Sequence, residues 1–236
     1  MALRVPEGMR IYAVGDIHGE IGLLDRLMEA IDADLLERPH ANVLEVFLGD
    51  YVDRGPDSQG VIAAMMALPK EGRRRVCLKG NHEAAFLDAM TDPQQMRLWR
   101  SFGGDATMRS YGVDPARAGH DPGLLQRALS AAVPADHVHF LMTLPVLHQE
   151  EEMIFVHAGL VPGQPLDAQR EEDLMWIRHE FLDYGGPLPG HVVHGHTPVE
   201  RPDHRAWRTN LDTGATFTGK LTAGVFEADT VRFLST

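Results

Sequence analysis

The N-terminal third of the chain repeats one layout three times, and this repetition constrains the fold more than any other feature. A short apolar run leads into a glycine-containing turn that carries a polar residue, and apolar residues at helical spacing follow. The apolar runs occupy residues 9–16, 43–50 and 75–81. Because strands that alternate with helices form a parallel sheet covered by helices, we expect an α/β fold.

The rest of the chain divides into a helical part and a strand-rich part. Residues 91–144 have helical patterning that is interrupted by turn formers such as Asp92-Pro93 and Gly103-Gly104, which indicates a helical insertion or cap. Short strands resume after residue 146, and their close spacing predicts a more antiparallel second half. A length of 236 residues without a low-complexity linker favours a single domain over residues 1–236.

The composition excludes several classes of partner. A formal net charge of -12 argues against general nucleic-acid binding, because phosphate backbones are held by clustered Lys and Arg. No segment approaches the ~18 consecutive apolar residues of a membrane span, and no signal region opens the chain. The single cysteine, Cys77, cannot form an intramolecular disulfide. We therefore expect a cytoplasmic protein with no nucleic-acid or membrane partner.

Five segments place a carboxylate, amide or imidazole after an apolar run and beside a glycine. Ligands bind at the carboxyl ends of strands in open α/β sheets, so these segments can converge. Each alone has an ordinary explanation, such as a charged turn or a helix cap by Asn81, but five in order are hard to obtain by chance. The segments are residues 15–19 (GDIHG), 49–55 (GDYVDRG), 80–83 (GNHE), 157–159 (HAG) and 194–197 (HGHT).

The donor types in these segments suit two divalent cations. A two-metal centre needs one bridging carboxylate and separate oxygen and imidazole donors for each ion. We assign Asp50 as the bridge. The first ion would be held by Asp16, His18 and Asp50, and the second by Asp50, Asn81, His157 and His196.

The ordered motifs resemble the signature of the PPP-type metallophosphoesterases, which include bacterial serine/threonine protein phosphatases and symmetrical dinucleoside tetraphosphatases. The resemblance spans residues 15–197. It implies the calcineurin-like metallophosphoesterase fold, a β-sandwich flanked by helices. It also implies a di-metal centre that often contains manganese, with iron, zinc or nickel as alternatives, and direct attack by a metal-bridging hydroxide.

The resemblance also assigns roles to individual residues. His82 corresponds to the general acid and Asp53 to the carboxylate that orients its imidazole. Arg54 corresponds to a phosphate-binding arginine, whose planar fork suits two phosphoryl oxygens. Arg178 resembles a second such arginine, with an exposed helix-face arginine as the alternative, and we also assign Asn81 to phosphate binding.

The remaining histidines have no comparable context. We treat His196 as the ligand in the segment HGHT and His194 as a structural histidine beside the metals rather than a seventh ligand. Histidines outside the motifs, among them His120, are expected to be structural or exposed.

The sequence therefore predicts a metal-dependent phosphoester hydrolase. The leading expectation is a phosphatase of phosphoserine and phosphothreonine in proteins that also cleaves small phosphoesters, because residues 102–112 resemble the equivalent part of bacterial serine/threonine phosphatases. A symmetrical dinucleoside tetraphosphatase is the alternative with the same metal ligands. A non-catalytic scaffold that binds phosphate or metal is the third reading, and a lost ligand or arginine would be its signature.

Overall fold

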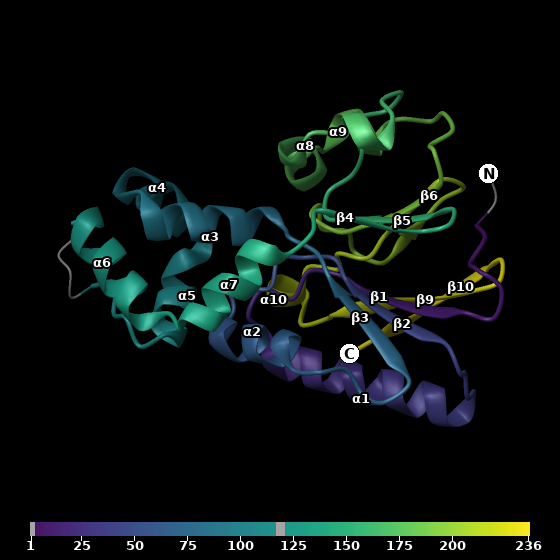
Figure 1. The fold of residues 1–236 in the computed structure, drawn as a ribbon, viewed down its shortest axis with the longest axis horizontal. Helices are drawn as coiled ribbons and strands as arrows, with labels where there is room; N and C mark the ends of the chain where they lie inside the picture. The colour runs from purple at the N-terminus through teal and green to yellow at the C-terminus, as the bar shows by residue number, and fades with distance from the viewer. Residues whose placement is uncertain (1–2, 117–120) are drawn as a thin grey trace.

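The computed structural model describes residues 3–116 and 121–236, so His120 lies outside the described residues. Two five-stranded sheets stack face to face, and helices cover their outer faces (Figure 1). This arrangement is the β-sandwich flanked by helices that the resemblance implied.

The first sheet contains the three N-terminal strands and the two C-terminal strands. Its order is β10-β9-β1-β2-β3, in which β1, β2 and β3 are parallel and β9 is antiparallel to both β1 and β10. Val14 of β1 pairs with Phe47 of β2, and Phe47 pairs with Cys77 of β3, so the three carboxyl ends are level. The strands are β1 (Arg10–Val14), β2 (Val43–Phe47), β3 (Arg73–Cys77), β9 (Thr222–Glu227) and β10 (Thr230–Ser235).

The second sheet also has three parallel strands in its centre. Its order is β4-β5-β6-β8-β7, in which β5, β6 and β8 are parallel and the edge strands β4 and β7 are antiparallel to their neighbours. The strands are β4 (Leu147–Glu150), β5 (Met153–Val156), β6 (His191–His194), β7 (Asp203–His204) and β8 (Arg208–Asn210).

The helices form three groups around the sheets (Figure 1). The pair α1 and α2 covers the first sheet, α8 and α9 lie over the second, and the helices from α3 to α7 extend beyond one end of the sandwich. The first group is α1 (Ile21–Glu37) and α2 (Ser58–Met66), and the second is α8 (Glu171–Trp176) and α9 (His179–Leu182). The 3-10 helix η2 (Leu166–Ala168) precedes α8, and α10 (Ala215–Thr218) follows β8. The third group is α3 (Asn81–Thr91), α4 (Pro93–Trp99), the π-helix η1 (Arg100–Gly104), α5 (Asp105–Ser110), α6 (Pro122–Ala132) and α7 (Ala135–Thr143).

Three buried clusters of apolar side chains stabilise the contacts between neighbouring layers. One buried cluster between the sheets includes Ile11, Val46, Phe155 and Val193. A second cluster joins the outer face of the first sheet to α1, α2 and the helices beyond, and a third joins the second sheet to α8 and α9. Burial at about 25 cal/mol per Å² of apolar surface makes these clusters the main stabilising contribution. They hold the strand ends, where the site lies, in fixed positions.

The expectation of a more antiparallel second half is correct for β9 and β10 but wrong for the centre of the second sheet. A parallel pair requires a crossover connection, and the chain between β5 and β6 supplies one that includes α8 and α9. The helices α8 and α9 are too short to give a clear helical period in the sequence. The strands on either side of them therefore look like neighbours in a hairpin.

Across residues 3–116 and 121–236, no helix combines the length and the apolar character that crossing a bilayer requires.

Candidate metal centre

The predicted ligands meet where the parallel strands of both sheets end. Asp16 and Asp50 follow β1 and β2, and Asn81 is the first residue of α3 after β3. From the second sheet, His157 follows β5 and His196 follows β6. The strand ends of both sheets therefore converge on one place, because each sheet contributes three adjacent parallel strands.

The backbone at this place is held in an uncommon conformation. Non-glycine residues rarely adopt a positive φ, which costs of order 1–3 kcal/mol and persists where the surroundings fix it. Close packing allows no side chain at two neighbouring glycines, since a Cβ on Gly80 would collide with Asp50 and one on Gly195 with Asp16. Five of the seven non-glycine residues with positive φ in the described chain are predicted site residues: His18, Asp50, Asp53, Arg54 and His196.

The two carboxylate oxygens of Asp50 face different histidines. Asp50 Oδ1 lies 3.4 Å from His157 Nε2, and Asp50 Oδ2 lies 3.5 Å from His18 Nε2. Asn81 Oδ1 is 3.0 Å from His157 Nε2. Two groups of buried ligand atoms share Asp50, one with His157 and His196 and the other with His18 and His82. The arrangement matches a carboxylate that bridges two ions.

Hydrogen bonds to the backbone direct the Nε2 atoms of two histidines into the site. His18 Nδ1 lies 2.8 Å from the carbonyl oxygen of Val52, and His157 Nδ1 lies 2.9 Å from that of Leu48. Each Nδ1 therefore carries a proton and donates it, which leaves Nε2 as the atom that could bind a cation. Burial lowers the pKa of His18 to about 3, so its imidazole is neutral. Burial opposes protonation of His157 too, but Asp50 outweighs it and raises the pKa of His157 to about 10, so a cation there would displace a proton from Nε2.

His196 presents a nitrogen that the protein leaves without a partner. Among the described residues, its Nε2 is one of three buried side-chain polar atoms that make no hydrogen bond. Burial lowers the pKa of His196 to about 2, which keeps the ring neutral. An unpaired buried polar atom costs about 1–3 kcal/mol, and a cation ligated by this nitrogen would remove that cost.

The carboxylates also fit bound cations. Asp16 accepts hydrogen bonds of 3.1 and 3.2 Å from the backbone N–H of His196. Burial, and next the charge of Asp212, raises the pKa of Asp16 well above its ordinary value. Burial would also raise the pKa of Asp50, but His157 and His82 beside it hold that pKa well below its ordinary value. Crowded buried carboxylates next to imidazoles are a donor set that divalent cations neutralise, so the residues fit two such ions.

The predicted acid and its partner are in contact. His82 Nδ1 lies 2.7 Å from Asp53 Oδ2, and both side chains are buried. Burial opposes protonation of His82, but Asp50 and Asp53 outweigh it and raise the pKa of His82. The pKa of His82 is therefore shifted in the direction that a proton donor requires.

Both predicted phosphate arginines contact residues of the predicted site. Arg54 Nη1 donates to His18 Nε2 at 2.7 Å, and Arg54 Nη2 lies 3.0 Å from His82 Nε2. The lone pair on His18 Nε2 can bind one partner at a time. A cation could therefore bind this nitrogen only after the hydrogen bond from Arg54 is broken. Arg178 donates to the carbonyl oxygen of His196 at 3.3 Å and to Thr197 Oγ1 at 3.1 Å.

Comparison with known proteins identifies the family. The model of the family described as calcineurin-like phosphoesterase matches residues 9–219. The chain belongs to the calcineurin-like phosphoesterase family.

Two named relatives of this phosphoesterase carry different activities in their names. Serine/threonine-protein phosphatase 1 of Salmonella typhimurium is 30% identical over 217 residues, which cover 90% of this chain and 89% of the relative. The asymmetrical bis(5'-nucleosyl)-tetraphosphatase PrpE of Oceanobacillus iheyensis is 28% identical over 239 residues, with 91% and 88% covered.

Solved structures agree with the fold of the phosphoesterase. A protein named as a candidate diadenosine tetraphosphatase superposes with a TM-score of 0.66 at 23% identity, covering 100% of this chain and 98% of that one. A cold-active protein tyrosine phosphatase superposes with a TM-score of 0.59 at 16% identity, covering 98% and 81%. These identities support the fold and leave the substrate of this chain undecided.

Sequence reasoning missed two residues that support the predicted acid. Trp99 Nε1 donates to Asp53 Oδ2 at 2.9 Å, and Thr107 Oγ1 donates to Asp53 Oδ1 at 2.6 Å. Both come from the helical region, 46 and 54 residues after Asp53 in the chain. Thr107 lies in the segment 102–112 that carries part of the resemblance, but no local pattern predicts that either residue contacts Asp53.

Two buried carboxylates were also missed. Glu83, the last residue of the segment GNHE, accepts hydrogen bonds from the backbone N–H groups of Asp50, Tyr51 and Gly80 at 2.7–2.8 Å. These bonds hold the loop that carries Asp50 against the start of α3. Asp212 follows β8 and is buried beside Asp16. Its context, a strand followed by Asp-Thr-Gly, has the same layout as the five segments, and that signal could have found it.

His194 has contacts of a structural kind. Its Nδ1 lies 3.1 Å from the carbonyl oxygen of Gly195, and its Nε2 lies 3.4 Å from Arg208 Nη1. Burial lowers the pKa of His194 to about 3. With both nitrogens engaged, the ring has no lone pair free for an ion.

Proposed function

We propose that this phosphoesterase hydrolyses phosphoesters with the help of two divalent cations that share Asp50. The observation that supports this proposal most directly is that the two carboxylate oxygens of Asp50 face the Nε2 atoms of different histidines. The mixture of carboxylate, amide and imidazole donors suits manganese, which we propose as the resident metal. The proposed ligands are Asp16, His18, Asp50, Asn81, His157 and His196.

The side chains around this centre would each serve in-line displacement. Bound cations would supply positive charge to the phosphoryl group and lower the pKa of the attacking water. Arg54 and Arg178, with Asn81, would hold the phosphoryl oxygens, since an arginine fork offers two parallel donors. His82 would give its proton to the leaving oxygen while Asp53 keeps the imidazole in place. No side chain is needed as a covalent nucleophile.

Two substrate classes are supported by separate observations. Hydrolysis of phosphoserine and phosphothreonine in proteins is supported by the 30% identity to a serine/threonine-protein phosphatase. Hydrolysis of dinucleoside tetraphosphates is supported by relatives whose names specify asymmetrical cleavage, whereas the sequence alone had suggested the symmetrical kind.

An activity profile tests the proposal. Manganese-reconstituted protein is assayed with a phosphoserine peptide, p-nitrophenyl phosphate, a phosphodiester and diadenosine tetraphosphate, before and after removal of metal by a chelator. We expect turnover of at least one substrate that disappears on chelation and returns with added manganese. Turnover that survives complete metal removal would refute the proposal.

A further inference from the structure

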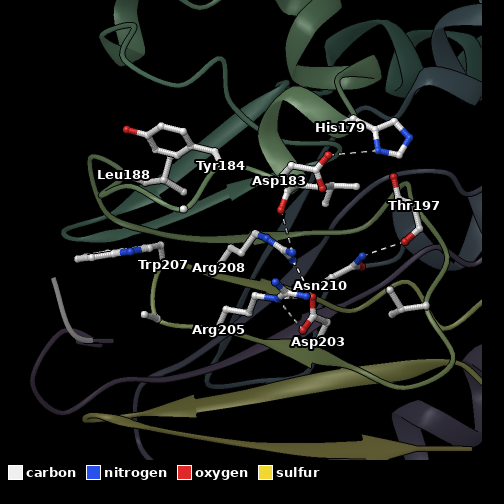
Figure 2. Close-up of a pocket in the computed structure, with 14 residues that line it drawn as sticks. His179, Asp183, Tyr184, Leu188, Thr197, Asp203, Arg205, Trp207, Arg208 and Asn210 are labelled. Carbon is white, nitrogen blue, oxygen red and sulfur yellow. Dashed lines mark hydrogen bonds and ion pairs between the residues drawn. The ribbon is translucent and has the colours of Figure 1, made fainter.

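A cavity of about 640 Å³ lies between α9 and the edge of the second sheet that β7 and β8 form (Figure 2). One wall comes from α9 and the loop after it, and the other comes from β7, β8 and the loop before them. Its volume is within the range of about 300–1,000 Å³ that small-molecule sites occupy. None of the roles proposed above uses this cavity.

One end of the cavity lies next to the predicted phosphate arginine. His179 and Thr197 line it, and they directly follow Arg178 and the ligand His196 in the chain. The hydrogen bond of 3.1 Å from Arg178 Nη1 to Thr197 Oγ1 joins the two walls at this end. A group attached to a phosphate at Arg178 can therefore enter the cavity.

Aromatic and apolar side chains line the other end. Trp207 lies three residues before Asn210 on the chain that forms β8, which places it about 10 Å from the Arg178 end at the usual rise of a strand. Tyr184 and Leu188 face the cavity from the opposite wall (Figure 2). Tyr184 is 39% exposed, so its ring is accessible to a ligand.

The charges inside the cavity are matched. Asp203 lies 3.0 Å from Arg208 Nη1 and 2.9 Å from Arg205 Nε. Asp183 lies 3.7 Å from His179 Nδ1. The two arginines and two aspartates among the described lining residues sum to zero formal charge, so the chemistry favours an uncharged occupant whose phosphates stay outside at Arg178.

The cavity also lacks what a peptide main chain needs. Peptides that bind along sheets pair with an unpaired strand edge. The edge strand here, β7, spans only Asp203–His204. A compact planar group fits this wall better than an extended peptide does.

We propose that the cavity binds the nucleoside of a nucleoside polyphosphate, with the base against Trp207 and Tyr184 and the phosphates at Arg178. This inference rests on the proposed phosphoesterase function and selects its nucleotide substrate class. Aromatic side chains are the usual stacking platforms for bases, and about 1–3 kcal/mol per stacked base corresponds to about 5- to 150-fold in affinity.

Binding of adenosine monophosphate to the full-length, manganese-loaded chain tests the proposal by calorimetry. Tyr184→Ala should weaken binding by about 5-fold or more, because it removes a stacking ring. Trp207→Phe should weaken binding less, because it reduces the stacking area without removing the ring. Phenylalanine is chosen at position 207 because Trp207 also packs against a buried cluster. Phe233→Ala is the matched control, since Phe233 is 38% exposed and lies on β10. Inorganic phosphate, used as a second probe, should bind all four proteins equally.

The outcomes separate this proposal from the proposed function. Unchanged binding of adenosine monophosphate by both cavity variants would overturn the nucleoside site, whatever esters the protein cleaves. A higher KM for a phosphoserine peptide in Tyr184→Ala, with nucleotide binding unchanged, would identify a peptide subsite and also overturn it. Weakened nucleotide binding in a protein that cleaves no phosphoester would support the site and refute the catalytic function.

Discussion

Thr107 Oγ1 lies 2.6 Å from Asp53 Oδ1, and this contact connects the helical region to the proposed acid. Asp53 in turn holds His82 Nδ1 at 2.7 Å, while Trp99 donates to the same carboxylate. The helices from α4 to α5 are therefore part of the support of His82, in addition to any contact with substrate. Changes in this region should alter proton transfer as well as selectivity.

Replacing the proposed acid tests its role. His82→Asn should lower kcat toward a phosphoserine peptide by about 10²- to 10⁴-fold, the usual contribution of general acid catalysis. The loss should be much smaller with p-nitrophenyl phosphate, because p-nitrophenolate leaves without a proton. Metal content, measured by mass spectrometry, should stay at the wild-type value. Equal losses on both esters would show that His82 is not the acid.

The support from the helical region has a similar test. Thr107→Val removes a hydroxyl that donates to a buried carboxylate, so the free energy of unfolding should fall by about 1.5–3 kcal/mol. The kcat for alkyl esters should fall more than that for aryl esters, because His82 is less well positioned. Thr143→Val is the control, since Thr143 Oγ1 bonds to carbonyl oxygens of its own helix. Denaturant unfolding and kinetics on both variants give the comparison.

The sequence could predict that the proposed ligands lie together, because each follows a strand whose carboxyl end is fixed by sheet register. Asp16 and Asp50 could be placed at one edge from the strand pattern alone, since β1 and β2 are parallel neighbours. The imidazoles of His157 and His196 followed from the same rule applied to the second sheet.

What the sequence did not predict depends on contacts between distant elements. Trp99 and Thr107 reach Asp53 from the two sides of a kink between α4 and α5, where Gly103 has a φ of 108°. The parallel pairing of β5, β6 and β8 depends on connections whose helices are short. Tertiary packing decides both, and local periodicity contains little information about either.

Asp212, which lies beside Asp16, should affect metal binding. Burial, together with the nearby charge of Asp50, raises the pKa of Asp212 to about 6. Asp212→Asn keeps an oxygen for the 2.9 Å hydrogen bond from the Gly214 N–H but removes one negative charge. The metal-free protein should therefore melt at a higher temperature, while affinity for manganese falls by about 10-fold or more, as for other residues that support ligands. Thermal unfolding with and without manganese measures both effects, and unchanged affinity would contradict the assignment.

His191 should make stability depend on pH. It is buried, its Nε2 lies 2.8 Å from Thr209 Oγ1, and burial, followed by the nearby His204, lowers its pKa to about 4. The unfolded chain, with an ordinary pKa of 6.5, binds a proton that the folded chain does not. This contribution to stability is complete above pH 6.5 and is lost as the pH falls toward 4, by up to about 1.4 kcal/mol per pH unit.

The substitution His191→Gln should flatten this part of the stability curve. Denaturant unfolding at several pH values between about 4 and 7 measures the slope for the variant and the wild type. His139→Gln, at an exposed histidine of α7, provides the matched control. Identical slopes for wild type and His191→Gln would show that this histidine does not contribute.

The bridging role of Asp50 is the centre of the account, and metal stoichiometry tests it most directly. After reconstitution with manganese and removal of free ions, mass spectrometry should find two ions per wild-type chain. Asp50→Asn should retain fewer than one, with loss of phosphoester hydrolysis, because both ions would lose a shared charged ligand. A wild-type protein that hydrolyses phosphoesters with a single ion, or an Asp50→Asn variant that keeps two, would contradict the account.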